Sequence, residues 1–225
     1  SLQKIIERRD PRLAIADDGS GHPSVPTSRR RQLAVIDDTV FASSHLVSET
    51  DRRETWDALQ QQFAHPVLAD DWDQWLDALE THDRPLLVLL PHHGAEGGLD
   101  YLEIGDEDLP PVKGHLSRGQ LDELYTNPRA ADPGPIVLLL GCQTGTSTEE
   151  GYVQLARRFQ ELRSSIVVGT LAKVLGRHAA PVAREFVKQL LAVNDPTMDF
   201  GTIMRRVRRR MLANGYLMAL CLVAL

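Results

Sequence analysis

One apolar run organises this chain, and it reads Pro135-Ile-Val-Leu-Leu-Leu-Gly-Cys-Gln-Thr-Gly145. Ile136–Leu140 has no helical period and is closed by Gly141, which is typical of a strand buried on both faces of a parallel sheet. Cys142 follows directly, at the carboxyl end of a strand, where open α/β sheets place their ligands. The sequence therefore predicts a central strand with a candidate reactive cysteine at its end.

A second apolar strand ends in a similar way. Leu86–Leu90 is followed by Pro91-His-His-Gly94, so two neighbouring strands could bring a thiol and an imidazole together. A cysteine nucleophile needs a lowered thiol pKa, a histidine that moves protons, and backbone N–H groups aimed at the developing oxyanion. Because Gly94 has no side chain, its backbone could approach a substrate closely, and its N–H and that of Cys142 could form an oxyanion hole.

The composition limits the class of protein. The chain has 225 residues, of which 42% are hydrophobic and 25% charged, as in a one-domain globular protein. Its net charge of −6 argues against a nucleic-acid partner. Two cysteines cannot form a disulfide framework, and the sequence has no signal peptide and no apolar run of about 18 residues. We therefore expect a cytoplasmic protein without a membrane partner.

The chain divides into an N-terminal linker or edge segment, residues 1–31, and a domain over residues 32–225. Strands are predicted at 33–36, 66–69, 85–90, 99–104, 136–140, 166–168 and 218–223, and helices at 48–63, 72–79, 117–125, 147–162, 179–193 and 200–213. Residues 94–98 are predicted to form a flexible loop. The alternation predicts a mostly parallel sheet with helices on both faces. Because the chain starts at Ser1 and ends within an apolar run, we expect it to be part of a longer polypeptide.

The order of three motifs resembles a known family. His93-Gly94 follows an apolar strand, Leu140-Gly-Cys-Gln-Thr-Gly145 comes next, and Val167-Val-Gly-Thr-Leu-Ala-Lys-Val174 follows before a helix. Over residues 33–225 this resembles the CHAT domains, which are bacterial caspase-like and separase-like cysteine peptidases often joined to TPR repeats. The histidine and the cysteine are about 50 positions apart, as in caspases.

The resemblance implies a caspase-like three-layer sandwich and a thiol protease that needs no cofactor and no metal. It implies a protein or peptide substrate, and regulation by other domains of the same polypeptide or by a partner. Cys142 would be the nucleophile and His93 the acid/base, because the family places its histidine immediately before glycine. His92 is the rival base. The chain departs from the family at Gly141, usually alanine, and at Pro91-His92, often Thr-His, and neither change removes a reacting group.

Related enzymes that cleave after lysine or arginine can carry an acid two positions before the nucleophile, on the same side of the strand. In this chain that position is Leu140. The nearest acidic candidates for the substrate pocket are Asp100, Glu103 and Glu96, on the segment after His93. We therefore expect the pocket to prefer an uncharged or apolar residue.

Other interpretations stay open. A catalytically silent signalling or scaffold module would share the same fold, and a lone cysteine at a strand end is often a packing residue. Asp37-Asp38 after the strand at 33–36 would suit the metal site of a receiver domain, with Lys173 as its lysine, although such acids more often cap the following segment. Arginines in 205–210 make one helix basic, which favours a solvated face over an RNA or partner surface.

Overall fold

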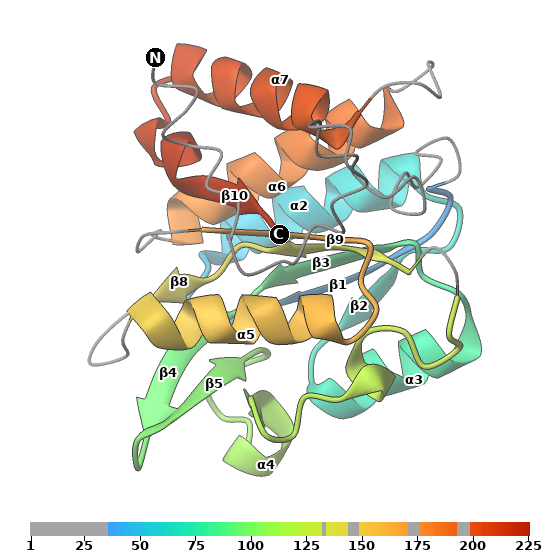
Figure 1. Cartoon of the computed structure of the whole chain (residues 1–225), viewed down its shortest axis with the longest axis vertical. Helices are drawn as coiled ribbons and strands as arrows, with labels where there is room; N and C mark the ends of the chain where they lie inside the picture. Colours follow the sequence, from blue (N-terminus) through green and yellow to red (C-terminus); the bar gives the residue numbers. More distant parts are fainter. Residues whose placement is uncertain (1–35, 132–133, 144–148, 171–175, 193–198) are drawn as a thin grey trace, which may run out of the picture.

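A six-stranded sheet crosses the middle of the protein, and helices cover both of its faces (Figure 1). The structure is a computed structural model that describes residues 36–131, 134–143, 149–170, 176–192 and 199–225. In spatial order the strands are β10 (Leu222–Ala224), β9 (Ile166–Thr170), β7 (Ile136–Leu139), β3 (Leu86–Leu90), β1 (Thr39–Ser43) and β2 (Val67–Ala69). All neighbours pair in parallel except β10, which runs antiparallel to β9 at the edge. The predicted mixed α/β fold with a mostly parallel sheet is confirmed.

The helices divide between the two faces of the sheet. One face carries α2 (Glu49–Gln62), α6 (Gly176–Leu191) and α7 (Phe200–Ala213), and the other carries α3 (Trp72–Thr81) and α5 (Glu149–Glu161) (Figure 1). Ser48 caps α2 and Asp71 caps α3, each by accepting a hydrogen bond from a backbone N–H of the first turn. Short segments complete the chain: α4 (Pro111–Gly114), η2 (Glu123–Tyr125) and η3 (Leu217–Cys221).

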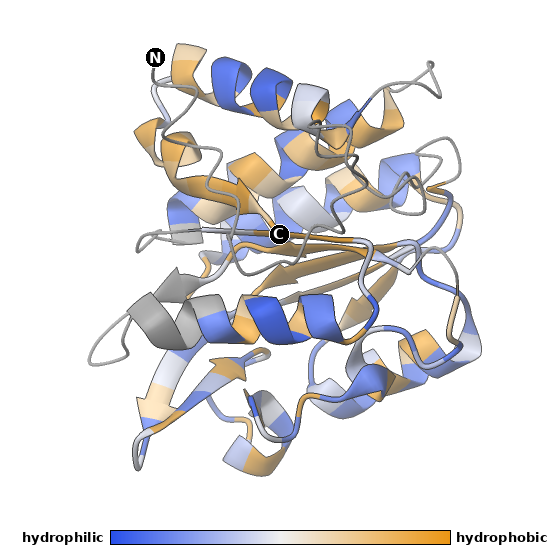
Figure 2. Cartoon of the chain, in the orientation of Figure 1, coloured by the Kyte–Doolittle hydropathy of each residue, from blue (hydrophilic) through white to orange (hydrophobic). Residues whose placement is uncertain are grey.

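The central strands are apolar because both of their faces are covered. All five side chains of β3 are fully buried, Leu86, Val88 and Leu90 toward α2 and α6, Leu87 and Leu89 toward α3 and α5. Each buried side chain of this kind contributes about 1.5–3 kcal/mol of hydrophobic free energy. In Figure 2 the strands of the large sheet are accordingly the most consistently hydrophobic part of the chain.

Several predicted elements were wrong. The strand at Thr39–Ser43, β1, was not predicted, and Asp37-Asp38 come directly before it, while the predicted strand at 33–36 lies outside the described residues except for Ile36. Residues 117–125 hold the end of strand β6 (His115–Ser117) and the single turn η2 instead of one helix. The final apolar segment is mostly the 3-10 turn η3, which leaves a short edge strand, β10. In each case short local patterns fit more than one element, and packing against the sheet decides between them.

Candidate active site

Two central strands leave the large sheet side by side and continue into a second one. Beyond Pro91, β3 continues as β4 (His92–Glu96), and beyond Gly141, β7 continues as β8 (Cys142–Gln143). The parallel pairing keeps its register across this break, because Leu89 faces Leu139 and His92 faces Cys142. Proline lacks a backbone N–H and glycine has a permissive backbone, so this pair of residues suits a bend in a ladder. The sequence-predicted cysteine and histidines therefore meet at one place.

The register decides how the two histidines lie relative to β8. His92 is aligned with Cys142 and His93 with Gln143. Adjacent residues of a strand project from opposite faces, so the two imidazoles leave β4 on opposite faces. The backbone of Cys142 belongs to the described residues, whereas its side chain does not. Residues 147 and 148, the first two of the helix predicted at 147–162, also lie outside the described residues. The backbone alone thus places both candidate bases one strand away from the cysteine.

His93 is completely buried and contacts a carboxylate. The exposed fraction of its side chain is 0%, and its Nε2 lies 3.1 Å from Oδ1 of Asp100. Burial lowers the pKa of His93 because it disfavours the imidazolium, and the charge of neighbouring His92 lowers this pKa further. The charge of Asp100 and its hydrogen bond oppose both effects. The net direction is downward, which favours a neutral imidazole in the resting protein.

A tight hairpin brings Asp100 to His93. Strand β5 (Leu99–Glu103) pairs antiparallel with β4, and Gly97 and Gly98, both with positive φ, form the turn between them. This turn aligns Ala95 with Asp100 and His93 with Leu102, so Asp100 is the diagonal neighbour of His93. The predicted flexible loop at 94–98 was therefore wrong, because most of it is strand. The Gly-Gly pair between two extended arms was the signal that could have predicted the hairpin and its register.

Tyr101 explains why position 94 is occupied by glycine. A Cβ at Gly94 would overlap the end of the Tyr101 ring, with the ring's Cε2 only 2.8 Å away. The ring also stacks on His115, with centroids 4.0 Å apart and 14° between the planes. Burial raises the pKa of Tyr101, and the charges of Glu103 and Glu96 raise it further. On this face, the space over Gly94 is thus filled by the protein itself.

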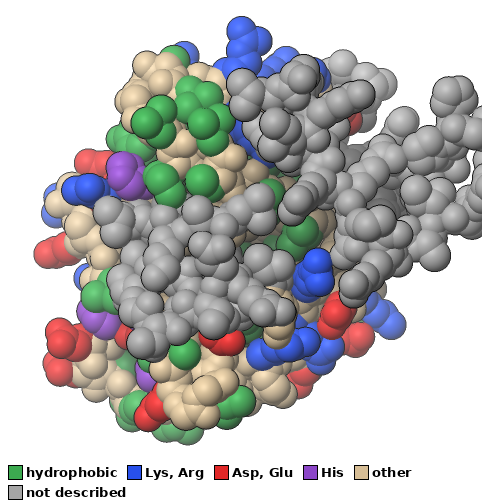
Figure 3. All heavy atoms as spheres, turned by 60° about the vertical axis from the view of Figure 1, so that its left-hand side comes forward, with side chains coloured by type: hydrophobic (Ala, Val, Ile, Leu, Met, Phe, Trp, Pro, Cys, Tyr) green, Lys and Arg blue, Asp and Glu red, His purple; other side chains and the backbone are tan. Residues whose placement is uncertain are grey.

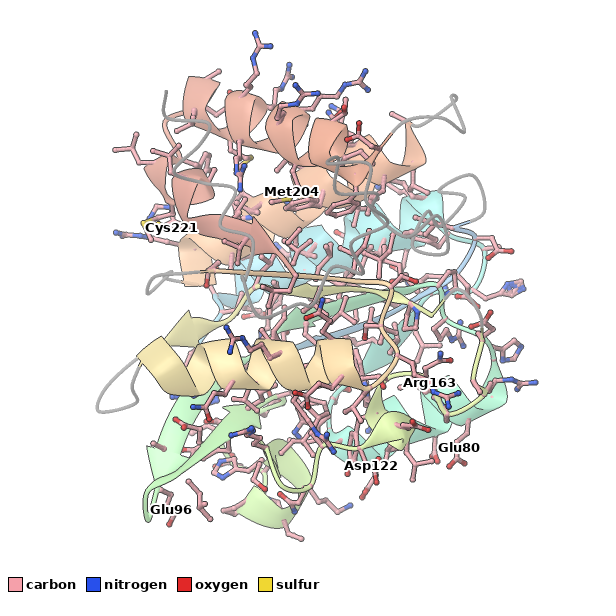
Figure 4. All side chains as sticks on the ribbon, in the orientation of Figure 1. Glu80, Glu96, Asp122, Arg163, Met204 and Cys221 are labelled. Atoms are coloured by element: carbon pink, nitrogen blue, oxygen red, sulfur yellow. The ribbon has the colours of Figure 1, made fainter. Side chains whose placement is uncertain are left out.

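The acidic pocket candidates lie in three different settings. Asp100 contacts His93, while Glu103 lies between His45 at 3.2 Å and His115 at 3.9 Å. Glu96 is exposed near the tip of the β4–β5 hairpin (Figure 4). The structure therefore does not gather these acids into one pocket.

Leu140, the fourth pocket candidate, is only 1% exposed and packs in the apolar core on the α2 and α6 face. This position adds an apolar surface beneath the break between β7 and β8. It brings no charge to the candidate site.

Asp38 has a structural role at the opposite end of the sheet. Asp38 forms an ion pair with Arg84, whose side chain is 3% exposed and also donates to the carbonyl oxygens of Ala78 and His65. Both acids come before β1, whereas ligands of such sheets bind beyond the carboxyl ends of the strands. Lys173 lies outside the described residues, and no metal-binding group of three or more His, Cys, Asp or Glu occurs within them. The receiver interpretation thus loses its geometric basis.

The basic helix α7 behaves as its amphipathic pattern predicts. Ile203, Met204, Val207 and Met211 are buried, while four arginines at 205, 206, 209 and 210 are exposed. Lys and Arg side chains gather at the upper end of the molecule in Figure 3, the end where α7 lies in Figure 1. Cys221 is half-buried on η3, next to this helix (Figure 4).

In comparisons with known proteins, the chain matches no protein-family profile and no curated protein sequence. Among the helices of the described residues, none combines the length and apolarity that a bilayer crossing requires.

Proposed function

We propose that this domain is a caspase-like cysteine endopeptidase in which Cys142 is the nucleophile and His93 the acid/base. One observation carries the proposal: β4 and β8 pair directly, so the His-His-Gly motif and the cysteine occupy adjacent positions beyond two central strands. A mostly parallel sheet with helices on both faces is the coarser architecture that a caspase-like sandwich needs. The His-Gly and Gly-Cys-Gln-Thr-Gly motifs add the resemblance to CHAT domains.

The reaction would follow the usual two steps of covalent catalysis. His93 takes the proton of the Cys142 thiol, and the thiolate attacks the carbonyl carbon of the scissile peptide bond. The tetrahedral oxyanion accepts hydrogen bonds from the N–H groups of Gly94 and Cys142. The C–N bond breaks as His93 returns the proton to the leaving amine, and a thioester remains. Water then hydrolyses the thioester, which frees the new carboxyl terminus and the thiol.

The burial of both histidines favours a second candidate, a catalytically silent signalling or scaffold module. His93 is 0% and His92 8% exposed, and an imidazole that exchanges protons with a substrate must be reached by it. A peptidase would therefore have to open this site when its substrate or an activating partner binds. A silent module needs neither the opening nor an activated thiolate.

A peptide-library cleavage assay on the full-length polypeptide tests the proposal. We expect cleavage by the wild-type protein and by Cys221→Ala, and loss of cleavage in Cys142→Ala, which removes the sulfur and little else. Cys221→Ala is the matched control because that thiol lies on η3, outside β8. Equal cleavage by both variants, or none by the wild-type protein in its activated form, would rule out the peptidase and favour the silent module.

A further inference from the structure

Building on the proposed function, we propose that Asp100 is the positioning residue of His93. Its carboxylate accepts a hydrogen bond from Nε2–H of the imidazole and thereby leaves Nδ1 as the nitrogen of the ring that takes up and returns a proton. Neither a motif in the sequence nor the family resemblance assigns this role to Asp100.

The contact itself fixes the protonation of the ring. An ionised carboxylate only accepts hydrogen bonds, so the ring nitrogen beside it must carry the hydrogen. The separation of 3.1 Å between Nε2 and Oδ1 is within hydrogen-bonding distance. A neutral imidazole has a single N–H, so the Nε2–H form leaves Nδ1 as the basic nitrogen. The carboxylate thus selects the tautomer and the orientation of the ring together.

The hairpin holds the two groups in place. Five consecutive register pairs join β4 to β5, and three more join β5 to β6. On the face that carries His93, the neighbouring Leu102 and Leu116 are buried in the core beneath α3 and α5. Asp100 keeps a side-chain exposure of 26%, so it remains hydrated while its partner is buried. A partly exposed carboxylate on a strand that pairs on both sides is suited to hold an imidazole in one orientation.

Other carboxylates near the hairpin are directed elsewhere. Glu103 contacts His45 and His115, and it is aligned with His92, on the opposite face of β4. Glu96 is exposed near the turn. Asp100 is the carboxylate that the described structure brings to His93, and this also removes it from the set of acids that could bind a basic substrate residue.

The charge of Asp100 also acts on the pKa of His93. Burial and His92 lower the pKa of His93, and Asp100 on β5 raises it. A Cys142 thiolate on β8 would be a further charge near His93. Replacing Asp100 by asparagine removes the negative charge, so the pKa of His93 falls further. Since His93 accepts the thiol proton in its neutral form, this lower pKa moves the acid limb of the pH–rate profile to lower pH.

The test combines NMR of the histidine ring with kinetics. In ¹⁵N-labelled wild-type protein, we expect long-range ¹H–¹⁵N correlations to show His93 as the Nε2–H tautomer when neutral. In Asp100→Asn, we expect a lower His93 pKa and at least a tenfold fall in kcat, part of the about 10²- to 10⁴-fold that a positioned acid/base contributes. Asp108→Asn is the matched control, because Asp108 is exposed after the same hairpin; it should change neither quantity.

The two proposals fail in different ways. An Nδ1–H tautomer in the wild-type protein overturns the role of Asp100, whether or not the protein cleaves peptides, and this measurement needs no variant that could misfold. An unchanged His93 pKa and kcat in folded Asp100→Asn also overturn it. Absence of cleavage by the activated wild-type protein, with the expected tautomer present, refutes the peptidase alone.

Discussion

Replacing Gly94 by alanine should destabilise the domain through Tyr101. The new methyl group would overlap the end of the Tyr101 ring, so the ring must swing out and leave its stack on His115. Loss of such a ring pair costs about 0.5–1.5 kcal/mol. The displaced ring would also be less buried. We therefore expect Gly94→Ala to lower the free energy of unfolding by about 1–2 kcal/mol, within the usual range for an overpacked site.

Chemical denaturation of four proteins measures this effect: wild type, Gly94→Ala, Tyr101→Ala and the double variant. Without the ring, the alanine has no partner to displace, and alanine is favoured over glycine in a strand by about 0.5–1 kcal/mol. Gly94→Ala should therefore be neutral or stabilising in the Tyr101→Ala background, with a coupling of about 1 kcal/mol or more between the two sites. If Gly94→Ala lowered the free energy of unfolding equally in both backgrounds, the Tyr101 ring would not be what the new methyl group collides with, and this explanation would be wrong.

Three further outcomes are expected. In the folded protein, iodoacetamide should alkylate Cys142 faster than half-buried Cys221, and at pH 7 faster than a free thiol of pKa about 8.5; equal or slower labelling at Cys142 counts against an activated nucleophile. Asp38→Ala should lower the free energy of unfolding by about 3 kcal/mol, because the buried guanidinium of Arg84 loses its carboxylate. Asp37→Ala, at the exposed neighbouring residue, should have little effect, and similar losses for both variants in denaturant titrations would contradict this. A peptide library should show preference for an uncharged or apolar residue before the scissile bond, since histidines already hold the two acids beside the site; strong Arg or Lys selectivity that disappears when one pocket acid is neutralised would contradict it.

Long apolar runs and amphipathic patterns predicted most of the fold. The strands β3, β7 and β9 are continuous runs of apolar residues, and such strands are buried on both faces between two layers of helices. The helices α2 and α7 follow from their 3.6-residue period and from Ser48 and Asp199, which cap them. These signals are local and strong, so neighbouring residues are sufficient to interpret them.

The misplaced elements depend on distant contacts. Asp38, directly before β1, binds Arg84 from the segment before β3, and no local pattern predicts that contact. Gly94 and its neighbours have loop-like composition, yet they form a strand because Tyr101 covers the glycine and β8 supplies the other edge. In both cases a partner far along the chain outweighs local propensity.

The candidate site, too, was only partly predictable from the sequence. Cys142 and the two histidines were predictable, because the ends of adjacent strands must meet at one edge of a sheet. The partner of His93 was not, since Asp100 depends on a hairpin register that the Gly97-Gly98 turn sets. The structure gives opposing indications for the base: alignment with Cys142 favours His92, while the contact with Asp100 favours His93.

The most direct test of a Cys142–His93 dyad compares His93→Ala with His92→Ala. Their cleavage rates are measured side by side on one library-derived peptide with the full-length protein. We expect His93→Ala to be inactive, because it lacks the imidazole held by Asp100, and His92→Ala to cleave more slowly but measurably. An inactive His92→Ala with an active His93→Ala would reverse the assignment of the base, and full activity in both variants would contradict a Cys-His dyad at this site.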